Sequence, residues 1–405
     1  MFRTWVFTEM PYPFTPPKET YESVRVTLPN RHYDPETGYE LYHRYLDIYR
    51  AADQFGLDIM VNEHHSTATC VEPSAPLVLG ILARETSRAR LLALGNPIAN
   101  RRDPLRVAEE MAMVDVLSRG RLEAGFVRGV PMEISAQNSN PVDMKERYWE
   151  AADLIERAWR THDGPFSFEG RFFHHRQVNI WPRPYQEPHP PIWLPTQSTS
   201  SAAEAAERGY TLATILNGTD GCRKIFDTYR ERAAALGDNP GDDRFAYLGL
   251  VFVAETDREA LAGARKLQWY LQNNKTAPQF MNVPGYVDVR ARAAMLREAA
   301  HGRHPGTPID HIIDAPVEEL VDDGFFFCGT PERVTEQVLN FHERVGGFGH
   351  LLAMVQAGTM GAGLVIRSMQ LLGEEVLPRV RAALASRRSE TNRSETLAGH
   401  LVAAG

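Results

Sequence analysis

Residues with acid–base chemistry follow a short apolar run near position 60. The run 59–61 is followed by Asn62, Glu63, His64 and His65. An imidazole titrates near neutral pH, so it can accept or donate a proton during a reaction. Side chains alternate along a strand, so Asn62 and His64 should share one side, and Glu63 and His65 the other. We interpret the histidine pair as candidate functional residues, with hydrogen bonding to loop carbonyls as the alternative.

A metal site at this pair is disfavoured. Adjacent residues on a strand point apart, and no further ligand at HxxxE or HxH spacing accompanies His64 and His65. The sequence therefore predicts no metal.

A second group of residues has the chemistry to bind a phosphate. Arg128 ends the apolar run 122–127, where a guanidinium can grip an anion with two hydrogen bonds. The segment 196–201, Thr-Gln-Ser-Thr-Ser-Ser, precedes a helical pattern, and a helix N-terminus with hydroxyls favours phosphate. A surface salt bridge would explain Arg128 alone, and a single serine cap would explain part of the second segment. The two features together predict a phosphate pocket.

Short apolar runs that alternate with helical patterns must position these residues. Strands are predicted at 4–8, 58–62, 91–96, 122–127, 191–195, 211–216, 246–254 and 349–355. Helices are predicted at 40–55, 74–88, 104–118, 145–161, 200–209, 222–236, 257–273, 331–345 and 361–385. Strand–helix units in this number predict an α/β fold of the (β/α)8 TIM barrel type, whose active face lies at the carboxyl ends of the strands. A doubly wound open sheet is the alternative, because periodicity does not distinguish a closed sheet from an open one.

Two segments are too long to be plain connections. Residues 9–38 follow the first strand, and residues 274–330 form an insertion between the seventh and eighth units. Within it, the stretch 273–290 looks like an irregular, partly aromatic excursion. Such loops at the catalytic face can cover a ligand, and surface elaboration is the alternative. The aromatic candidates for lining a substrate pocket are Tyr12, Phe14, Phe280 and Tyr286. We expect one barrel domain over residues 1–385, followed by a polar tail at 386–405.

Composition restricts the partners. Acidic residues outnumber basic ones, 52 against 44, so a basic nucleic-acid surface is not expected. The three cysteines are far apart, which argues against a disulfide framework and fits a reducing cytoplasm. No apolar stretch reaches the roughly 18 residues of a membrane helix, and the N-terminus has no signal-peptide pattern. A cytoplasmic location is expected.

Taken together, the motifs resemble the bacterial luciferase-like, flavin-dependent monooxygenase family, also called the LLM class of flavin-dependent oxidoreductases. The similarity covers about residues 1–270 and 325–380. It lies in Glu-His-His at 63–65, in the segments 102–110 and 114–129, in Ser-Thr-Ser-Ser-Ala-Ala-Glu-Ala-Ala-Glu-Arg-Gly at 198–209, and in Glu-Glu-Val-Leu-Pro-Arg-Val at 374–380.

The resemblance implies a (β/α)8 barrel that binds FMN, usually in the reduced form. His64 corresponds to the family's catalytic histidine, while Asn62 and His65 are candidates for contacting substrate. Asn96 stands where a non-prolyl cis peptide faces the flavin, so the Gly95–Asn96 bond is expected to be cis. The positions that match cofactor-binding residues are Asn96, Arg128, Tyr148, Gln197, Ser198, Thr199 and Ser201.

The implied activity is that of a two-component monooxygenase. A separate flavin reductase supplies reduced FMN, which reacts with O2 to give a C4a-(hydro)peroxyflavin. This intermediate oxygenates a small organic substrate by hydroxylation, epoxidation or Baeyer–Villiger insertion. A homodimer is also expected from the resemblance. The alternatives are a deazaflavin-dependent hydride-transfer oxidoreductase of the same superfamily and a non-catalytic flavin-binding protein.

Overall fold

A closed barrel of parallel strands forms the centre of the molecule. The structure is a computed structural model that describes residues 1–273, 276–300, 312–313 and 315–389. Within these residues, eight parallel strands form the barrel: β1 (Arg3–Thr8), β2 (Asp58–Val61), β3 (Leu91–Asn96), β4 (Leu122–Phe126), β7 (Ile192–Pro195), β8 (Thr211–Ile215), β9 (Phe245–Val253) and β11 (His350–Gln356). β11 pairs with both β1 and β9, and β8 also pairs with β9, so the sheet closes on itself. The predicted TIM barrel is confirmed over the open sheet.

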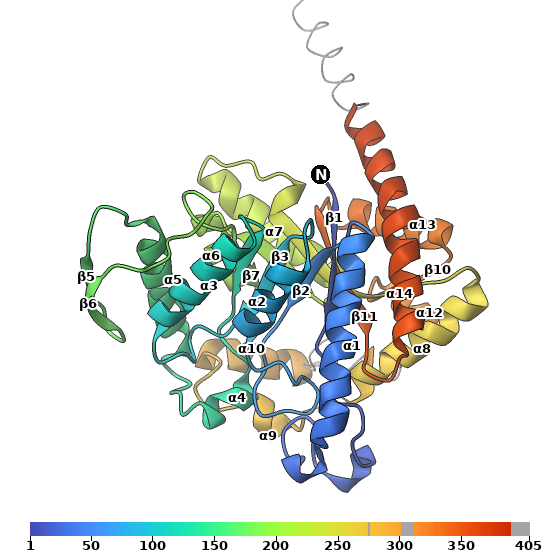
Figure 1. Cartoon of the computed structure of the whole chain (residues 1–405), viewed down its shortest axis with the longest axis horizontal. Helices are drawn as coiled ribbons and strands as arrows, with labels where there is room; N and C mark the ends of the chain where they lie inside the picture. The colour runs from blue at the N-terminus through green and yellow to red at the C-terminus, as the bar shows by residue number, and fades with distance from the viewer. Residues whose placement is uncertain (274–275, 301–311, 314, 390–405) are drawn as a thin grey trace, which may run out of the picture.

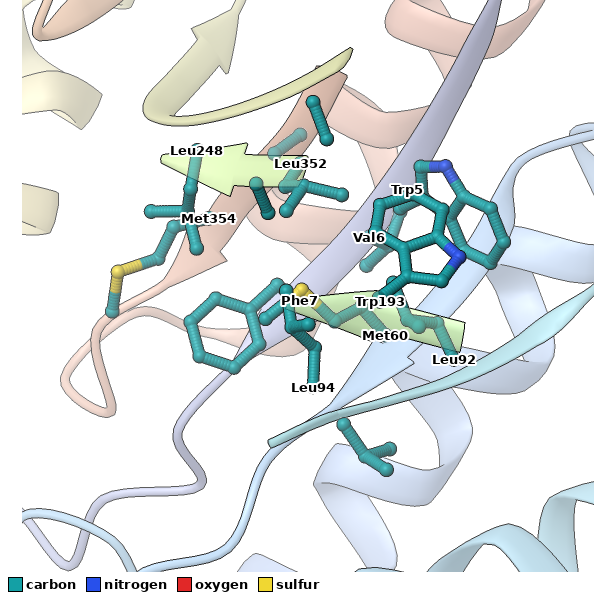
Figure 2. Packing of buried hydrophobic residues seen from close by; sticks show 14 of the residues in the cluster. Trp5, Val6, Phe7, Met60, Leu92, Leu94, Trp193, Leu248, Leu352 and Met354 are labelled. Atoms are coloured by element: carbon teal, nitrogen blue, oxygen red, sulfur yellow. The ribbon is translucent and has the colours of Figure 1, made fainter. Parts of the chain in front are cut away.

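The interior of the barrel is filled by apolar side chains from several strands (Figure 2). Trp5 on β1 meets Trp193 on β7 edge to face, with ring centroids 5.5 Å apart. The indole N–H of Trp5 donates to Nδ1 of His350 on β11 at 3.1 Å. Burial lowers the pKa of His350 to about 4, so this histidine stays neutral and accepts the bond. Trp5 therefore ties the first strand to the last one.

Helices surround the barrel, as the predicted alternation requires (Figure 1). They are α1 (Pro35–Gln54), α2 (Ala75–Glu85), α3 (Pro104–Leu117), α5 (Met144–Arg160), α6 (Thr199–Arg208), α7 (Gly218–Ala235), α8 (Asp257–Asn273), α13 (Pro331–Arg344) and α14 (Ala362–Leu371). Side-chain caps begin several of them: Asp34 accepts from the N–H of Thr37, and Thr330 from that of Arg333. A π-helical turn, Leu372–Val376, extends α14, and the helix continues over residues 377–389.

Some elements were not predicted. An antiparallel hairpin of β5 (Phe166–Glu169) and β6 (His174–Val178) lies between α5 and β7, away from the barrel (Figure 1). A short strand, β10 (Phe326–Gly329), pairs with the second half of β9, whereas β11 pairs with the first half. β9 therefore pairs with three strands: β8 and β11 along its first half and β10 along its second half.

The 9–38 segment and residues 276–300 of the insertion lie at the end of the barrel where the strands finish (Figure 1). The segment 9–38 contains only the 3-10 turns Lys18–Thr20 and Asn30–His32. The stretch 273–290 is irregular in its described residues apart from one short helix and the ends of its flanking helices, as expected. The described part of the insertion also includes longer helical segments. It contains α9 (Pro278–Met281), α10 (Val289–Ala300) and α12 (Val317–Asp322). In Figure 1, α9 lies beside α4 (Pro131–Ala136), the short helix that follows β4, and the two helices are in contact.

The predicted polar tail begins later than expected, because residues 386–389 still belong to the last helix. The rest of that tail, 390–405, and residues 301–311 of the insertion lie outside the described residues. Among the helices that the structure describes, none combines the length and apolar character needed to cross a membrane.

Candidate active site

His64 lies between two carboxylates that come from different parts of the chain. Its Nδ1 is 2.8 Å from Oε1 of Glu133 on α4. The same oxygen accepts the backbone N–H of His65 at 3.1 Å. On the other edge of the ring, Nε2 is 3.8 Å from Oε1 of Glu9, the residue after β1. The His64 side chain keeps 16% exposure, whereas that of Glu133 keeps 2%.

Charge compensates the burial of Glu133. Burial alone would raise the pKa of this carboxyl, but its hydrogen bond and charge interaction with His64 outweigh that effect. The N–H of His65 and the nearby guanidinium of Arg25 act in the same direction, so the pKa of Glu133 is lowered. Arg25 comes from the 9–38 segment and also lies 3.6 Å from Glu9. Glu133 is therefore ionised at neutral pH.

His65 faces the opposite way and joins a separate network. Its Nε2 lies 3.0 Å from Oε1 of Glu63. Glu63 also accepts from Arg101 at 2.7 Å and from the N–H of Ala75, in the first turn of α2, at 3.1 Å. The contact between Glu63 and His65 follows the predicted alternation. Asn62 is buried, and its side-chain oxygen accepts from the thiol of Cys70 at 3.8 Å.

The end of β3 departs from the expected backbone by one residue. The non-prolyl cis bond is Leu94–Gly95, so the prediction of a cis Gly95–Asn96 bond is wrong. Glycine is needed here because a Cβ on Gly95 would lie 2.0 Å from Cγ1 of Val127 after β4. Strand alternation carries no information about which of two neighbouring peptide bonds is cis.

Two buried amides next to this bond have no partner among the described residues. Asn96 is fully buried, and neither its Oδ1 nor its Nδ2 is hydrogen-bonded. Asn100, in the turn that follows, is 6% exposed and shares this property. Buried amides are normally paired, so these groups are suited to a polar ligand.

Arg128 contacts a residue of the insertion. Its guanidinium carbon lies 3.8 Å from the centre of the Tyr286 ring. The Tyr286 hydroxyl donates to the carbonyl of Gly129 at 2.6 Å. Tyr286, predicted as a substrate-pocket residue, thus covers Arg128, the residue predicted to bind the phosphate.

The predicted hydroxyl cluster forms the N-terminus of α6. Ser198 is the cap: its Oγ accepts from the N–H of Ser201 and lies 2.8 Å from Oγ of Ser200. Thr199 is the first helical residue. Gln197 is exposed, and its amide donates to the carbonyl of Ile215 at 2.7 Å. Since β4 pairs with β7, this cluster and Arg128 follow neighbouring strands.

The remaining candidates have partners of their own. Tyr148 is buried on α5 and donates to the carbonyl of Phe126 at 3.2 Å. Tyr12 is buried within the 9–38 segment, and its hydroxyl accepts from the N–H of Asp34 at 3.1 Å. Phe14 packs edge-on against Tyr12 but is 59% exposed. Phe280 belongs to α9, which contacts α4.

The arrangement can be compared with known proteins. A family model described as luciferase-like monooxygenase matches residues 24–346. The chain belongs to the luciferase-like monooxygenase family. It is 24% identical over 370 residues to 2,5-diketocamphane 1,2-monooxygenase 2 of Pseudomonas putida, covering 86% of this chain and 96% of that protein.

Solved structures of other proteins share the family's fold. The FMN complex of a type II Baeyer–Villiger monooxygenase from Pseudomonas putida, the oxygenating constituent of 3,6-diketocamphane monooxygenase, superimposes with a TM-score of 0.69 at 21% identity. It covers 94% of this chain and 99% of that chain. An F420-dependent secondary alcohol dehydrogenase, bound to an F420–acetone adduct, gives a TM-score of 0.64 at 16% identity, with coverage of 94% and 99%.

Sequence reasoning missed part of the site. Glu9 directly follows β1, and the strand-end position that indicated His64 would have indicated it too. Glu133 lies in a six-residue helix whose acidic residue carries no distinctive pattern. Arg25 comes from a segment without periodicity, so only the folded chain brings it to Glu9.

Proposed function

We propose that this chain is the oxygenase component of a two-component monooxygenase that uses reduced FMN and O2 to oxygenate a small organic substrate. Support comes chiefly from the grouping of His64, the unpaired amide of Asn96 and the cation of Arg128 at the carboxyl ends of neighbouring strands. Family membership and the FMN complex of the diketocamphane enzyme point the same way. The oxygenation would be a hydroxylation, an epoxidation or a Baeyer–Villiger insertion.

The residues present fit FMN. The flat flavin ring offers hydrogen-bond donors and acceptors on one edge, which would satisfy the unpaired amides of Asn96 and Asn100. Arg128 and the free N–H groups at the start of α6 suit a phosphate. The residues that would hold the phosphate are Arg128, Ser198, Thr199 and Ser201. Tyr148 would support this site from behind β4 by its bond to Phe126.

Bound reduced FMN would supply the electrons that activate O2. The protein's part is to bind, orient and exclude water. His64 would hold or move a proton at Nε2, the ring nitrogen not occupied by Glu133. The segment 9–38 and helix α9 lie over this end of the barrel, where they would keep water from the reacting atoms (Figure 1).

We propose two protein partners, a flavin reductase and a second copy of the chain. A separate flavin reductase would deliver reduced FMN, in keeping with the description of the diketocamphane enzyme as an oxygenating constituent. A second copy of the chain would pack on α2 and α3, two neighbouring helices that expose large apolar side chains. These side chains are Leu77, Ile81, Met113, Val116 and Leu117.

Rapid mixing tests the proposed activity. The protein would first be titrated anaerobically with reduced FMN and, in parallel, with a reduced deazaflavin. It would then be mixed with O2. The expected result is preferential binding of reduced FMN, with O2 consumption that precedes the return of oxidised-FMN absorbance. Preferential deazaflavin binding without O2 consumption would favour the hydride-transfer oxidoreductase instead.

A further inference from the structure

The two edges of the His64 ring have different surroundings. Nδ1 faces the buried carboxylate of Glu133 at hydrogen-bonding distance, 2.8 Å. Nε2 faces Glu9, whose side chain is less buried than that of Glu133. The distance from Nε2 to Glu9 is 3.8 Å, too far for a direct hydrogen bond. A ligand or water group that carries two hydrogens could therefore donate to both Nε2 and Glu9 at about 2.8 Å.

A neutral imidazole carries one proton, and its partners decide which nitrogen holds it. An ionised carboxylate can only accept a hydrogen bond. Glu133 therefore requires the proton on Nδ1 of His64, which leaves a lone pair on Nε2. The same oxygen of Glu133 accepts the N–H of His65, so the carboxylate is held in place by two donors.

We propose that Glu133 is the positioning residue of His64: it keeps the proton on Nδ1 and aims Nε2 at the site as a proton acceptor. The inference rests on the proposed function and adds to it a residue that the sequence did not indicate. In the step it supports, an O–H or N–H bond of the bound ligand breaks and an Nε2–H bond forms. The resulting imidazolium is stabilised by Glu133 and Glu9, whose combined charge is offset by Arg25.

The arrangement of His65 provides an internal comparison. Glu63 is likewise buried and likewise contacts a histidine ring, at 3.0 Å, but it is also held by Arg101 and by the start of α2. Glu63 thus shares the chemistry of Glu133 without contacting His64. Glu63→Ala is therefore a matched control for Glu133→Ala.

The primary test reads the tautomer and needs no cofactor. Ring nitrogen-15 shifts of the full-length protein are measured at a pH where His64 is neutral, and the His64 signals are assigned by comparison with His64→Asn. The expected result is an Nδ1–H tautomer in the wild type and in Glu63→Ala, with a shift toward Nε2–H in Glu133→Ala. An Nδ1–H tautomer that survives in Glu133→Ala overturns the proposal.

The second test measures what positioning does for the reaction. Oxidation of protein-bound reduced FMN by O2 should slow by roughly a hundredfold in Glu133→Ala, the lower end of general acid–base effects, with the Kd for reduced FMN within twofold of wild type. Glu133→Gln keeps an acceptor for the His65 N–H, so it removes the negative charge while this backbone contact is retained. Its oxidation rate should fall between those of Glu133→Ala and wild type. Wild-type rates in both variants overturn the role of Glu133.

The two readouts separate this inference from the proposed function. If the wild type does not bind reduced FMN, the proposed function fails, and the tautomer comparison alone decides whether Glu133 controls His64. If reduced FMN binds and reacts but the tautomer is Nε2–H in the wild type, the proposed function survives and the inference fails.

Discussion

The guanidinium of Arg128 is stacked on the ring of Tyr286, 3.8 Å from its centre. The two residues are far apart in the sequence: Arg128 follows β4, and Tyr286 belongs to the insertion before the eighth barrel strand. The Tyr286 hydroxyl also holds the carbonyl of Gly129 at 2.6 Å. The insertion is thereby attached to the predicted phosphate site at two points.

Replacement of Tyr286 should weaken FMN binding indirectly, through its effect on Arg128 and not through loss of a contact with the phosphate. Tyr286→Ala removes the stacking that fixes the Arg128 guanidinium, an interaction of about 0.5–2 kcal/mol, so Kd should rise by about twofold to thirtyfold. Tyr286→Phe keeps the ring and should bind FMN nearly as well as wild type. Fluorescence titration measures both, and equal Kd values for Tyr286→Ala and wild type would refute the coupling.

Removal of the Arg128 cation should have a larger effect. Charge-assisted hydrogen bonds contribute about 1.5–3 kcal/mol, so Arg128→Ala should raise the Kd for FMN by roughly tenfold to a hundredfold. Riboflavin, which lacks the phosphate, should bind both proteins equally. Arg176, an exposed arginine on β6, provides the control substitution Arg176→Ala. An unchanged Kd in Arg128→Ala would remove this residue from the phosphate site.

Glu72 should make stability depend on pH. It is fully buried, and neither carboxylate oxygen has a hydrogen-bond partner among the described residues. Burial, and then the charges of Glu63 and Glu9, raise the pKa of Glu72 well above 4.5. The native state thus keeps a proton that the unfolded chain loses above about pH 4.5. The stability contributed by the protonated carboxyl is complete below that pH and is lost as pH rises toward the native pKa.

The measurement is the free energy of unfolding as a function of pH. Glu72 should contribute a decrease of about 1 kcal/mol per pH unit above pH 4.5, and Glu72→Gln should remove it. The exposed Glu85 on α2 gives the control Glu85→Gln, which should retain the slope. A slope that is identical in Glu72→Gln and wild type would show that Glu72 ionises in the native state.

Charge on the α2–α3 surface should dissociate the proposed homodimer. Leu77 and Met113 are 67% and 56% exposed, and a glutamate at each position would place like charges opposite one another across a twofold interface. Light scattering should show a dimer for wild type and a monomer for the double variant. Tyr39→Glu, on the exposed face of α1, should stay dimeric. A monomeric wild type would contradict the assembly.

The barrel was predictable because its strands are short apolar runs with polar residues at their ends. β2 shows this well: its apolar residues are buried, and His64 follows where the chain leaves the barrel. Closure of the sheet was not readable, since the pairing of β11 with β9 and β1 depends on the whole chain. β10 was missed because its few apolar residues lie within a long insertion.

The candidate site was predictable only where it lies at strand ends. His64 and Arg128 both follow strands, so their positions are fixed by the barrel. Glu133, Arg25 and Tyr286 lie in segments whose placement depends on tertiary packing, and sequence pattern does not determine which side chains they contact. Tyr286 was named as a pocket residue, but its contact with Arg128 became visible only in the folded chain.

The strand β11 fills the gap between β1 and β9, and its His350 accepts a bond from Trp5, 345 residues earlier. During synthesis, β1 leaves the ribosome long before this neighbour exists. Until residues 350–356 emerge, β1 and β9 each carry an unpaired edge of backbone donors and acceptors. Each of these edges can pair with another chain until β11 closes the barrel, so the last strand also ends the chain's exposure to edge-to-edge association.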